Sequence, residues 1–224
     1  AEYSADFRSL TERAFSSSRL FVGYSGRIDS GALSELVAAL PAGTTGDAAD
    51  APVFDASPYI IDIPADVGYS ALGHNIYALD KSFGGSCSVL SSFMTYGYLW
   101  NMIRVQGGAY GTGMNIRANG DIFCYSYRDP DLHGSRLAYS GMAGFLKDTL
   151  SQDMMLDDII IGTVGSSAPL LSPSGVCSLE CVRYLKGITP EYLADIRRQI
   201  LHTTSQELAA FEDTLRRFSE SGKL

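Results

Sequence analysis

One segment, residues 85–125, limits the folds open to this chain more than any other, because a helix pattern is followed closely by a hairpin pattern. Apolar residues from Val89 to Ile103 recur at spacings of four and three, which places them on one face of a helix. Asn119-Gly120 then lies between two runs of strand-forming residues, as in a two-residue type I′ hairpin. A helix next to antiparallel strands predicts an α+β domain.

The helix stripe and the hairpin register together predict the core of this segment. The stripe consists of Val89, Phe93, Tyr96, Trp100 and Ile103. Trp100 is the only tryptophan of the chain, and we expect a buried anchor of the helix there and not a ligand-stacking residue. A two-residue turn pairs Ile116 with Phe123 and Met114 with Tyr125, on the face expected to meet the core.

Capping residues, prolines and strand-forming residues predict the remaining elements. Asp129-Pro130 is expected to be the N-cap and first residue of a helix that buries Ala138, Met142, Phe145 and Leu146. We expect strands at 19–25, 59–63 and 67–77, a surface loop at 42–52, and helices within 1–18, from 29 or 30 to 40, from 153, at 172–186, at 190–201 and from Thr204. The prediction is one domain over residues 1–224, with a mixed, largely antiparallel sheet and helices packed mainly on one face.

Composition excludes two classes of partner. No run approaches the roughly 18 apolar residues that cross a bilayer, so we expect no membrane association. The formal net charge of -8 argues against nucleic acid, whose phosphates require a basic surface. The same charge favours basic peptides as ligands through long-range attraction. With 224 residues, 46% of them hydrophobic, the chain is long enough to bury a full core.

The cysteines and histidines carry only weak signals of chemistry. Cys87, Cys124, Cys177 and Cys181 are too few and too scattered for a disulfide framework, and reduced, buried thiols are the simplest interpretation. Cys177 and Cys181 lie one helical turn apart. They leave open a metal site shared with His202, which would be an incomplete tetrahedron, or a nucleophilic thiol with His202 as its base.

Two strong donors flank a pair of glycines in Arg104-Val105-Gln106-Gly107-Gly108-Ala109-Tyr110. An arginine offers a planar fork of N–H groups, and a tyrosine is a neutral O–H donor at pH 7, so together they suit a carbonyl oxygen that becomes negative. An ordinary structural interpretation also exists: Gly107 as a C-cap, Arg104 as a solvated cation in the last turn, and Tyr110 as a half-buried strand aromatic. Arg128 could shape substrate approach, but an ion pair with a carboxylate is the preferred interpretation.

These residues resemble a known family. Residues 99–111 and the run Ser126-Tyr127-Arg128-Asp129-Pro130 are similar to the C-terminal half of insulinase-type (M16) zinc peptidases, above all to the presequence-protease branch. The resemblance implies that Arg104 and Tyr110 are catalytic and polarise the substrate carbonyl, with Gly107 and Gly108 as a positioning loop. It also implies an M16-type metalloendopeptidase that degrades short unfolded peptides, with zinc and the general base supplied by an N-terminal half of the same protein.

The chain departs from that family in one respect. Its three histidines, His74, His133 and His202, form no HxxEH motif, so we expect no metal in this chain and no activity from it alone. The first residue is Ala, and a fragment of a larger soluble peptidase is expected, in a bacterial cytoplasm or an organelle matrix. Two alternatives stay open: an inactive peptide-binding or scaffold module, and a subunit that acts in trans with a zinc-bearing partner.

Overall fold

The computed structural model describes residues 3–43, 60–150 and 156–221. Its contacts divide the chain into two compact units, the first made of residues 1–54 and 170–189 and the second of residues 55–169 and 190–224. Among the helices of the described ranges, none combines the length and the hydropathy that crossing a bilayer requires. The expectation of one domain over residues 1–224 stays a prediction.

The first unit is helical in its described part. It contains α1 (Ser4–Ala14), a 3-10 turn (Ser17–Arg19), α2 (Ser30–Ala38) and α6 (Pro173–Leu185). The helix start predicted at 29 or 30 is confirmed, and the cap is Asp29, whose carboxylate accepts from the Gly31 N–H at 2.8 Å. The helix predicted at 172–186 is also confirmed, and its cap is Ser172, whose hydroxyl accepts from the Gly175 N–H at 3.2 Å.

Two predicted strands are wrong. Residues 20–25 form no strand; instead Phe21 stacks on Tyr184 of α6 with ring centroids 5.2 Å apart. A strand needs a neighbour for its backbone hydrogen bonds, and the described part of this unit has none to offer. Residues 60–63 are irregular, and Ile60 is 98% exposed, while residue 59 lies outside the described ranges. Of the loop predicted at 42–52, only residues 42 and 43 are described.

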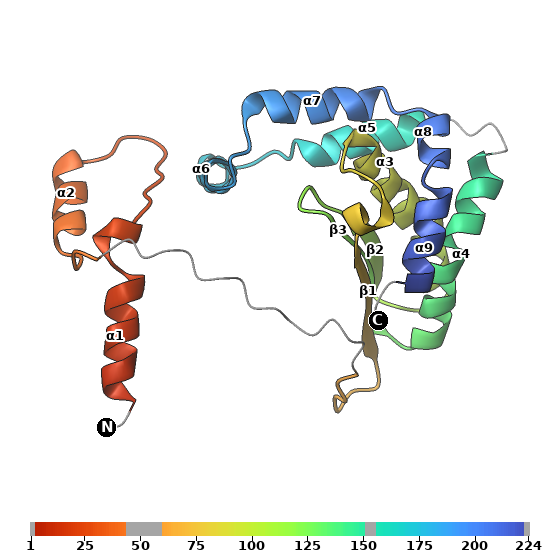
Figure 1. Ribbon diagram of the computed structural model, residues 1–224, viewed down its shortest axis with the longest axis horizontal. Helices are drawn as coiled ribbons and strands as arrows, with labels where there is room; N and C mark the ends of the chain where they lie inside the picture. Colours follow the sequence, from red (N-terminus) through yellow and green to blue (C-terminus); the bar gives the residue numbers. More distant parts are fainter. Residues whose placement is uncertain (1–2, 44–59, 151–155, 222–224) are drawn as a thin grey trace. The chain divides into compact units, whose positions relative to one another are not determined.

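The second unit is an α+β fold, as predicted. Three antiparallel strands in the order β1-β3-β2 form its sheet, and helices α3, α4 and α9 lie on one side of that sheet (Figure 1). The elements are β1 (Gly68–Asn75), a 3-10 turn η2 (Ile76–Leu79), α3 (Gly85–Met94), a π-helix η3 (Thr95–Gln106), β2 (Gly111–Ile116), β3 (Asp121–Asp129), α4 (Leu132–Leu150), α5 (Asp157–Ser167), α7 (Pro190–Leu201), α8 (Ser205–Ala209) and α9 (Glu212–Ser221).

The hairpin between β2 and β3 is confirmed, but its predicted register is wrong by one residue. Ile116 pairs with Ile122 and Met114 with Cys124, because the turn holds three residues and not two. Gly120 has φ +95° in this turn, the left-handed conformation that three-residue hairpins require. A shift of one residue turns every side chain of β3 over, so Phe123 and Tyr125 lie on the face away from the core.

The helix before the hairpin is also confirmed, with a different set of buried residues. Val89, Phe93 and Ile103 are buried, but Tyr96 is 71% exposed and Trp100 is only half-buried. The reason is the switch from α-helix to π-helix at Thr95, since each π turn takes in one more residue than an α turn. Met94, Leu99 and Ile103, at spacings of five and four, therefore form the buried stripe.

The buried stripe of the π-helix leads to a prediction about the free energy of unfolding. Leu99 is fully buried, so Leu99→Ala should lower the free energy of unfolding by about 2–5 kcal/mol through lost packing and a residual cavity. Tyr96→Ala is the matched control from the exposed side of the same helix, and should change it by less than about 0.5 kcal/mol. Urea titration followed by the fluorescence of Trp100 measures both variants. Equal losses would contradict the π-helical stripe.

The helix after β3 begins later than predicted. The N-cap is Asp131, whose carboxylate accepts from the Gly134 N–H at 2.9 Å, and Asp129 instead belongs to the end of β3. Ala138, Met142 and Leu146 are buried in α4 as expected, and Phe145 is partly buried against them. The capping box at Thr204 is confirmed, while the start predicted at residue 153 lies outside the described ranges.

Candidate functional site

The two glycines between the candidate donors end the π-helix, and each is required for a different reason. Gly107 keeps helical backbone angles, and a Cβ there would lie 2.6 Å from the carbonyl oxygen of Ile103. Gly108 has φ +81°, and its N–H donates to the Arg104 carbonyl at 3.1 Å, which is the αL motif of a helix end. The backbone of this turn therefore requires glycine at both positions, because neither accepts a side chain without strain.

Arg104 lies in the last turn of the π-helix and is exposed. Its guanidinium carbon lies 4.1 Å from the centre of the Trp100 ring, a cation–π contact. Trp100, predicted as a buried anchor, therefore supports the arginine from the helix surface.

Tyr110 stands on the other side of the turn, directly before β2, and its side chain is 60% exposed. Its N–H donates to the Arg128 carbonyl at 3.3 Å, so the end of β3 holds its backbone. Its ring packs against Tyr127 with centroids 5.3 Å apart, and the Arg128 guanidinium carbon lies 5.8 Å from the ring centre. The phenol thus projects from an anchored position and not from a free loop.

Hydroxyl groups tie β2 to α3 and to the first residue of the π-helix that carries Arg104. Thr95 accepts from the Met114 N–H at 2.9 Å, and Ser91 accepts from the Ile116 N–H at 3.1 Å. These bonds satisfy the outer edge of β2, which would otherwise offer free backbone donors. Because the strand and the helix are joined in this way, the two ends of the glycine turn keep a constant relation.

Arg128 does not form the predicted ion pair. No carboxylate of the described residues lies within 4.0 Å of it, and its guanidinium lies over the Tyr110 ring instead. Its φ of +48° is uncommon for a residue with a side chain. The register of β1 with β3 skips Arg128, since Tyr69 pairs with Tyr127 and Gly68 with Asp129.

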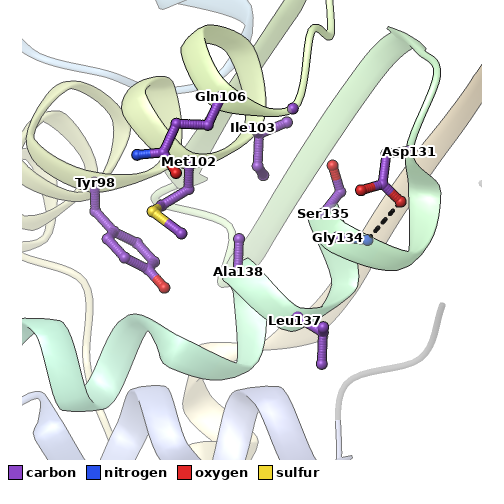
Figure 2. Close-up of a pocket in the computed structure, with 10 residues that line it drawn as sticks. Tyr98, Met102, Ile103, Gln106, Asp131, Gly134, Ser135, Leu137 and Ala138 are labelled. Carbon is purple, nitrogen blue, oxygen red and sulfur yellow. Dashed lines mark hydrogen bonds between the residues drawn. The ribbon is translucent and has the colours of Figure 1, made fainter.

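A cavity of about 330 Å³ opens between the end of the π-helix and the first turns of α4 (Figure 2). Tyr98, Met102 and Gln106 line it from the π-helix, and Asp131 and Ser135 from the other side. Neither Arg104 nor Tyr110 lines this cavity. Both donors are exposed, so they are free to act on a molecule outside this unit.

The described residues offer neither a metal site nor an activated thiol. No three His, Cys, Asp or Glu side chains among them come together in a way that could hold a metal ion, so these residues do not fit a zinc site. Cys87 and Cys124 are buried and free, and burial raises the pKa of both thiols. Cys177 and Cys181 are half-buried on α6, where burial and the neighbouring Cys177 raise the pKa of Cys181. A raised pKa disfavours the thiolate that a nucleophile needs.

One further residue, which follows the contact partner of Tyr110 in the chain, was not predicted as part of the site. Asp129 is 1% exposed and accepts three hydrogen bonds at the end of β3. Its position before a proline favoured a helix cap, and only the fold brings its hydroxyl partners together. Ser70 and Tyr139 continue this buried polar group, with their hydroxyls 3.0 Å apart; burial raises the pKa of Tyr139 to about 12, so that phenol stays neutral.

Comparisons with known proteins place these residues in a family context. The family described as the PreP C-terminal domain matches residues 59–223. Presequence protease 1 of Arabidopsis thaliana, described as chloroplastic/mitochondrial, is 34% identical over 158 residues, which is 69% of this chain and 14% of that protein. Protein HypA of Clostridium perfringens is 31% identical over 146 residues, 65% of this chain and 15% of that protein. The chain thus spans about one seventh of the length of these relatives.

Proposed function

Because the chain belongs to the family of PreP C-terminal domains, we propose that it is the C-terminal part of a zinc-dependent M16 endopeptidase that degrades short unfolded peptides. In this proposal an N-terminal half of the same protein holds zinc and the general base, which together activate the attacking water. The chain itself supplies donors for the carbonyl of the bond that is cut.

Arg104 and Tyr110 are those donors. As water adds to the peptide carbonyl, its oxygen gains negative charge, and the guanidinium N–H groups and the phenol O–H donate to it. Donors that are already in place stabilise the transition state without reorganisation, and the loss of one such donor typically costs about 2.7–4 kcal/mol. A neutral ground-state carbonyl gains less from the same bonds, so the effect falls on turnover more than on binding.

One observation supports this assignment above the others. Arg104 and Tyr110 are both exposed at the two ends of a turn whose glycines allow no side chain, in a chain of a peptidase family. The contact of the Arg104 guanidinium with Trp100 and the hydrogen bond between Thr95 and β2 hold the residues on both sides of this turn.

The charge of the chain bears on its substrates. A net charge of -8 attracts basic peptides over long range, and added salt weakens that attraction. We place the full-length enzyme in solution in a bacterial cytoplasm or an organelle matrix. The second of these agrees with the chloroplastic/mitochondrial description of the Arabidopsis relative.

The test uses the full-length protein and this chain alone, each incubated with fluorescence-quenched unfolded peptides. We expect cleavage by the full-length protein, loss of cleavage with 1,10-phenanthroline, recovery with zinc, and no cleavage by this chain alone. Peptide binding without cleavage would identify an inactive module. Cleavage that appears only after a second, zinc-bearing subunit is added would identify a partner acting in trans.

A further inference from the structure

Asp129 is a buried carboxylate without a cation. Its side chain is 1% exposed, and it takes part in none of the ion pairs of the described residues. A buried carboxylate is costly unless hydrogen bonds replace its lost hydration. The position of the Asp129 carboxylate at the end of a strand therefore makes it important which segments its hydrogen bonds hold in place.

The hydrogen bonds of Asp129 join three segments. Its Oδ2 accepts from the Ser126 hydroxyl at 2.5 Å and from the Ser135 hydroxyl at 2.6 Å, and its Oδ1 accepts from the Asp131 N–H at 2.9 Å. Ser126 lies on β3, Asp131 in the connection, and Ser135 in the first turns of α4. Both serines are 2% exposed, so water does not replace these donors readily.

The residue directly before Asp129 has a strained backbone. Arg128 has φ +48° and is the residue that the pairing of β1 with β3 leaves out. Such conformations persist where the surrounding structure fixes them on both sides. Arg128 follows the regularly paired part of β3. It is followed directly by Asp129, whose carboxylate accepts three hydrogen bonds.

This strained residue makes two contacts with the candidate catalytic phenol. The Arg128 carbonyl accepts from the Tyr110 N–H at 3.3 Å, and its guanidinium carbon lies 5.8 Å from the centre of the Tyr110 ring. The backbone and the ring of Tyr110 thus both depend on how Arg128 is held.

We infer that Asp129 is a positioning residue for Tyr110: its hydrogen bonds to Ser126, Ser135 and Asp131 fix the bend at Arg128, and that bend aims the phenol. The inference rests on the proposed function, since it assigns a role relative to the catalytic use of Tyr110. Asp129 itself touches neither substrate nor the reacting atoms.

A double-mutant cycle in the full-length enzyme tests this role. Asp129→Asn keeps the shape but turns one acceptor oxygen into an NH₂ donor, so either the Asp131 N–H loses its acceptor or the Ser126 and Ser135 hydroxyls must rotate and accept where they now donate. We expect kcat to fall about tenfold or more with KM within about threefold, as misplacement of a catalytic group does. In a Tyr110→Phe background the same change should lower kcat by less than about twofold, because no hydroxyl remains to be aimed.

Two further variants keep the cycle interpretable. Thr163→Val removes another buried hydroxyl, which donates to Ser92 at 2.8 Å between α5 and α3, and we expect it to leave kcat within about twofold. If Asp129→Asn does not fold, Ser135→Ala removes a single donor and enters the same cycle. Hydrogen exchange supplies an independent readout: the Tyr110 amide should exchange faster in the Asp129 variant, with the amide of Cys124 in the central strand β3 unchanged.

The outcomes separate the two claims. Equal factors of loss in the wild-type and Tyr110→Phe backgrounds would overturn the positioning role and leave the proposed function standing. Unchanged exchange of the Tyr110 amide would overturn the positioning role as well. Full activity of Tyr110→Phe alone would overturn the catalytic role that the proposed function gives to Tyr110, and this inference with it.

Discussion

Replacing Tyr110 by phenylalanine should lower the kcat of the full-length peptidase about a hundredfold or more, with KM changed by no more than about threefold. The substitution removes one hydroxyl and keeps the ring that packs against Tyr127 at 5.3 Å. The lost bond is strongest when the carbonyl oxygen carries charge, so the transition state loses more than the bound substrate does. Steady-state kinetics with a fluorescence-quenched peptide measure both constants.

The neighbouring Tyr127 provides the matched control for this prediction. It is another partly exposed tyrosine, 37% accessible, in contact with the same ring. Tyr127→Phe removes a hydroxyl of the same chemistry from the neighbouring ring, and should leave kcat within about twofold. Wild-type turnover in Tyr110→Phe, or an equal loss in both variants, would refute the catalytic assignment of Tyr110.

Replacing Arg104 by lysine should cost about a hundredfold in kcat even though the positive charge is kept. A lysine ammonium is a point charge on a flexible stem and does not reproduce the planar fork of the guanidinium. The stacking of the guanidinium on Trp100, at 4.1 Å, would be weakened as well, so the charge would be both differently shaped and less well placed.

Arg117 provides a control with the same chemical change. Its guanidinium carbon also stacks on an aromatic ring, 4.8 Å from the centre of Phe123, but it lies at the hairpin end of the sheet. Arg117→Lys makes the same change from a planar guanidinium to an ammonium and weakens the same kind of stacking, but it does so away from the glycine turn. It should therefore leave kcat within about twofold of wild type. Rescue of activity by lysine at position 104 would show that charge alone is needed there.

The sequence predicted several elements of both units well, because their signals are local. A hairpin at Asn119-Gly120, a helix before Gly107, and helix starts at 29 or 30, at 172 and at Thr204 each depend on a few adjacent residues. Such local preferences act wherever the chain lies, so they survive folding.

The errors arose where one additional residue, in a hairpin turn or in a turn of helix, changes which side chains face the core. A three-residue turn in place of two reversed the faces of β3, and a π-helix from Thr95 moved Tyr96 and Trp100 out of the core. Asn119-Gly120 is compatible with both turn lengths, since a three-residue hairpin also needs a left-handed residue at its last position. The strand expected at 19–25 failed for another reason, since strand-forming residues also pack well against a helix when no strand is available.

The candidate site shows the same division between local and tertiary information. Arg104 and Tyr110 stood out because their spacing and the intervening glycines resemble a family motif. Arg128 and Asp129 belong to a second motif, but their contacts follow from the meeting of β3, α4 and the start of β2. An ion pair was expected for Arg128, and the fold placed its guanidinium over an aromatic ring instead.

The most direct test of the central claim compares how the two site variants bind a phosphinic peptide and the matched peptide substrate. A phosphinic group imitates the tetrahedral oxyanion, so donors that act on that oxygen contribute to its binding more than to binding of the substrate. For Tyr110→Phe and Arg104→Lys we predict about a hundredfold weaker inhibition by the phosphinic peptide, with substrate affinity within about threefold of wild type. Equal weakening of both ligands, or none, would contradict the claim that these two side chains meet at the carbonyl oxygen.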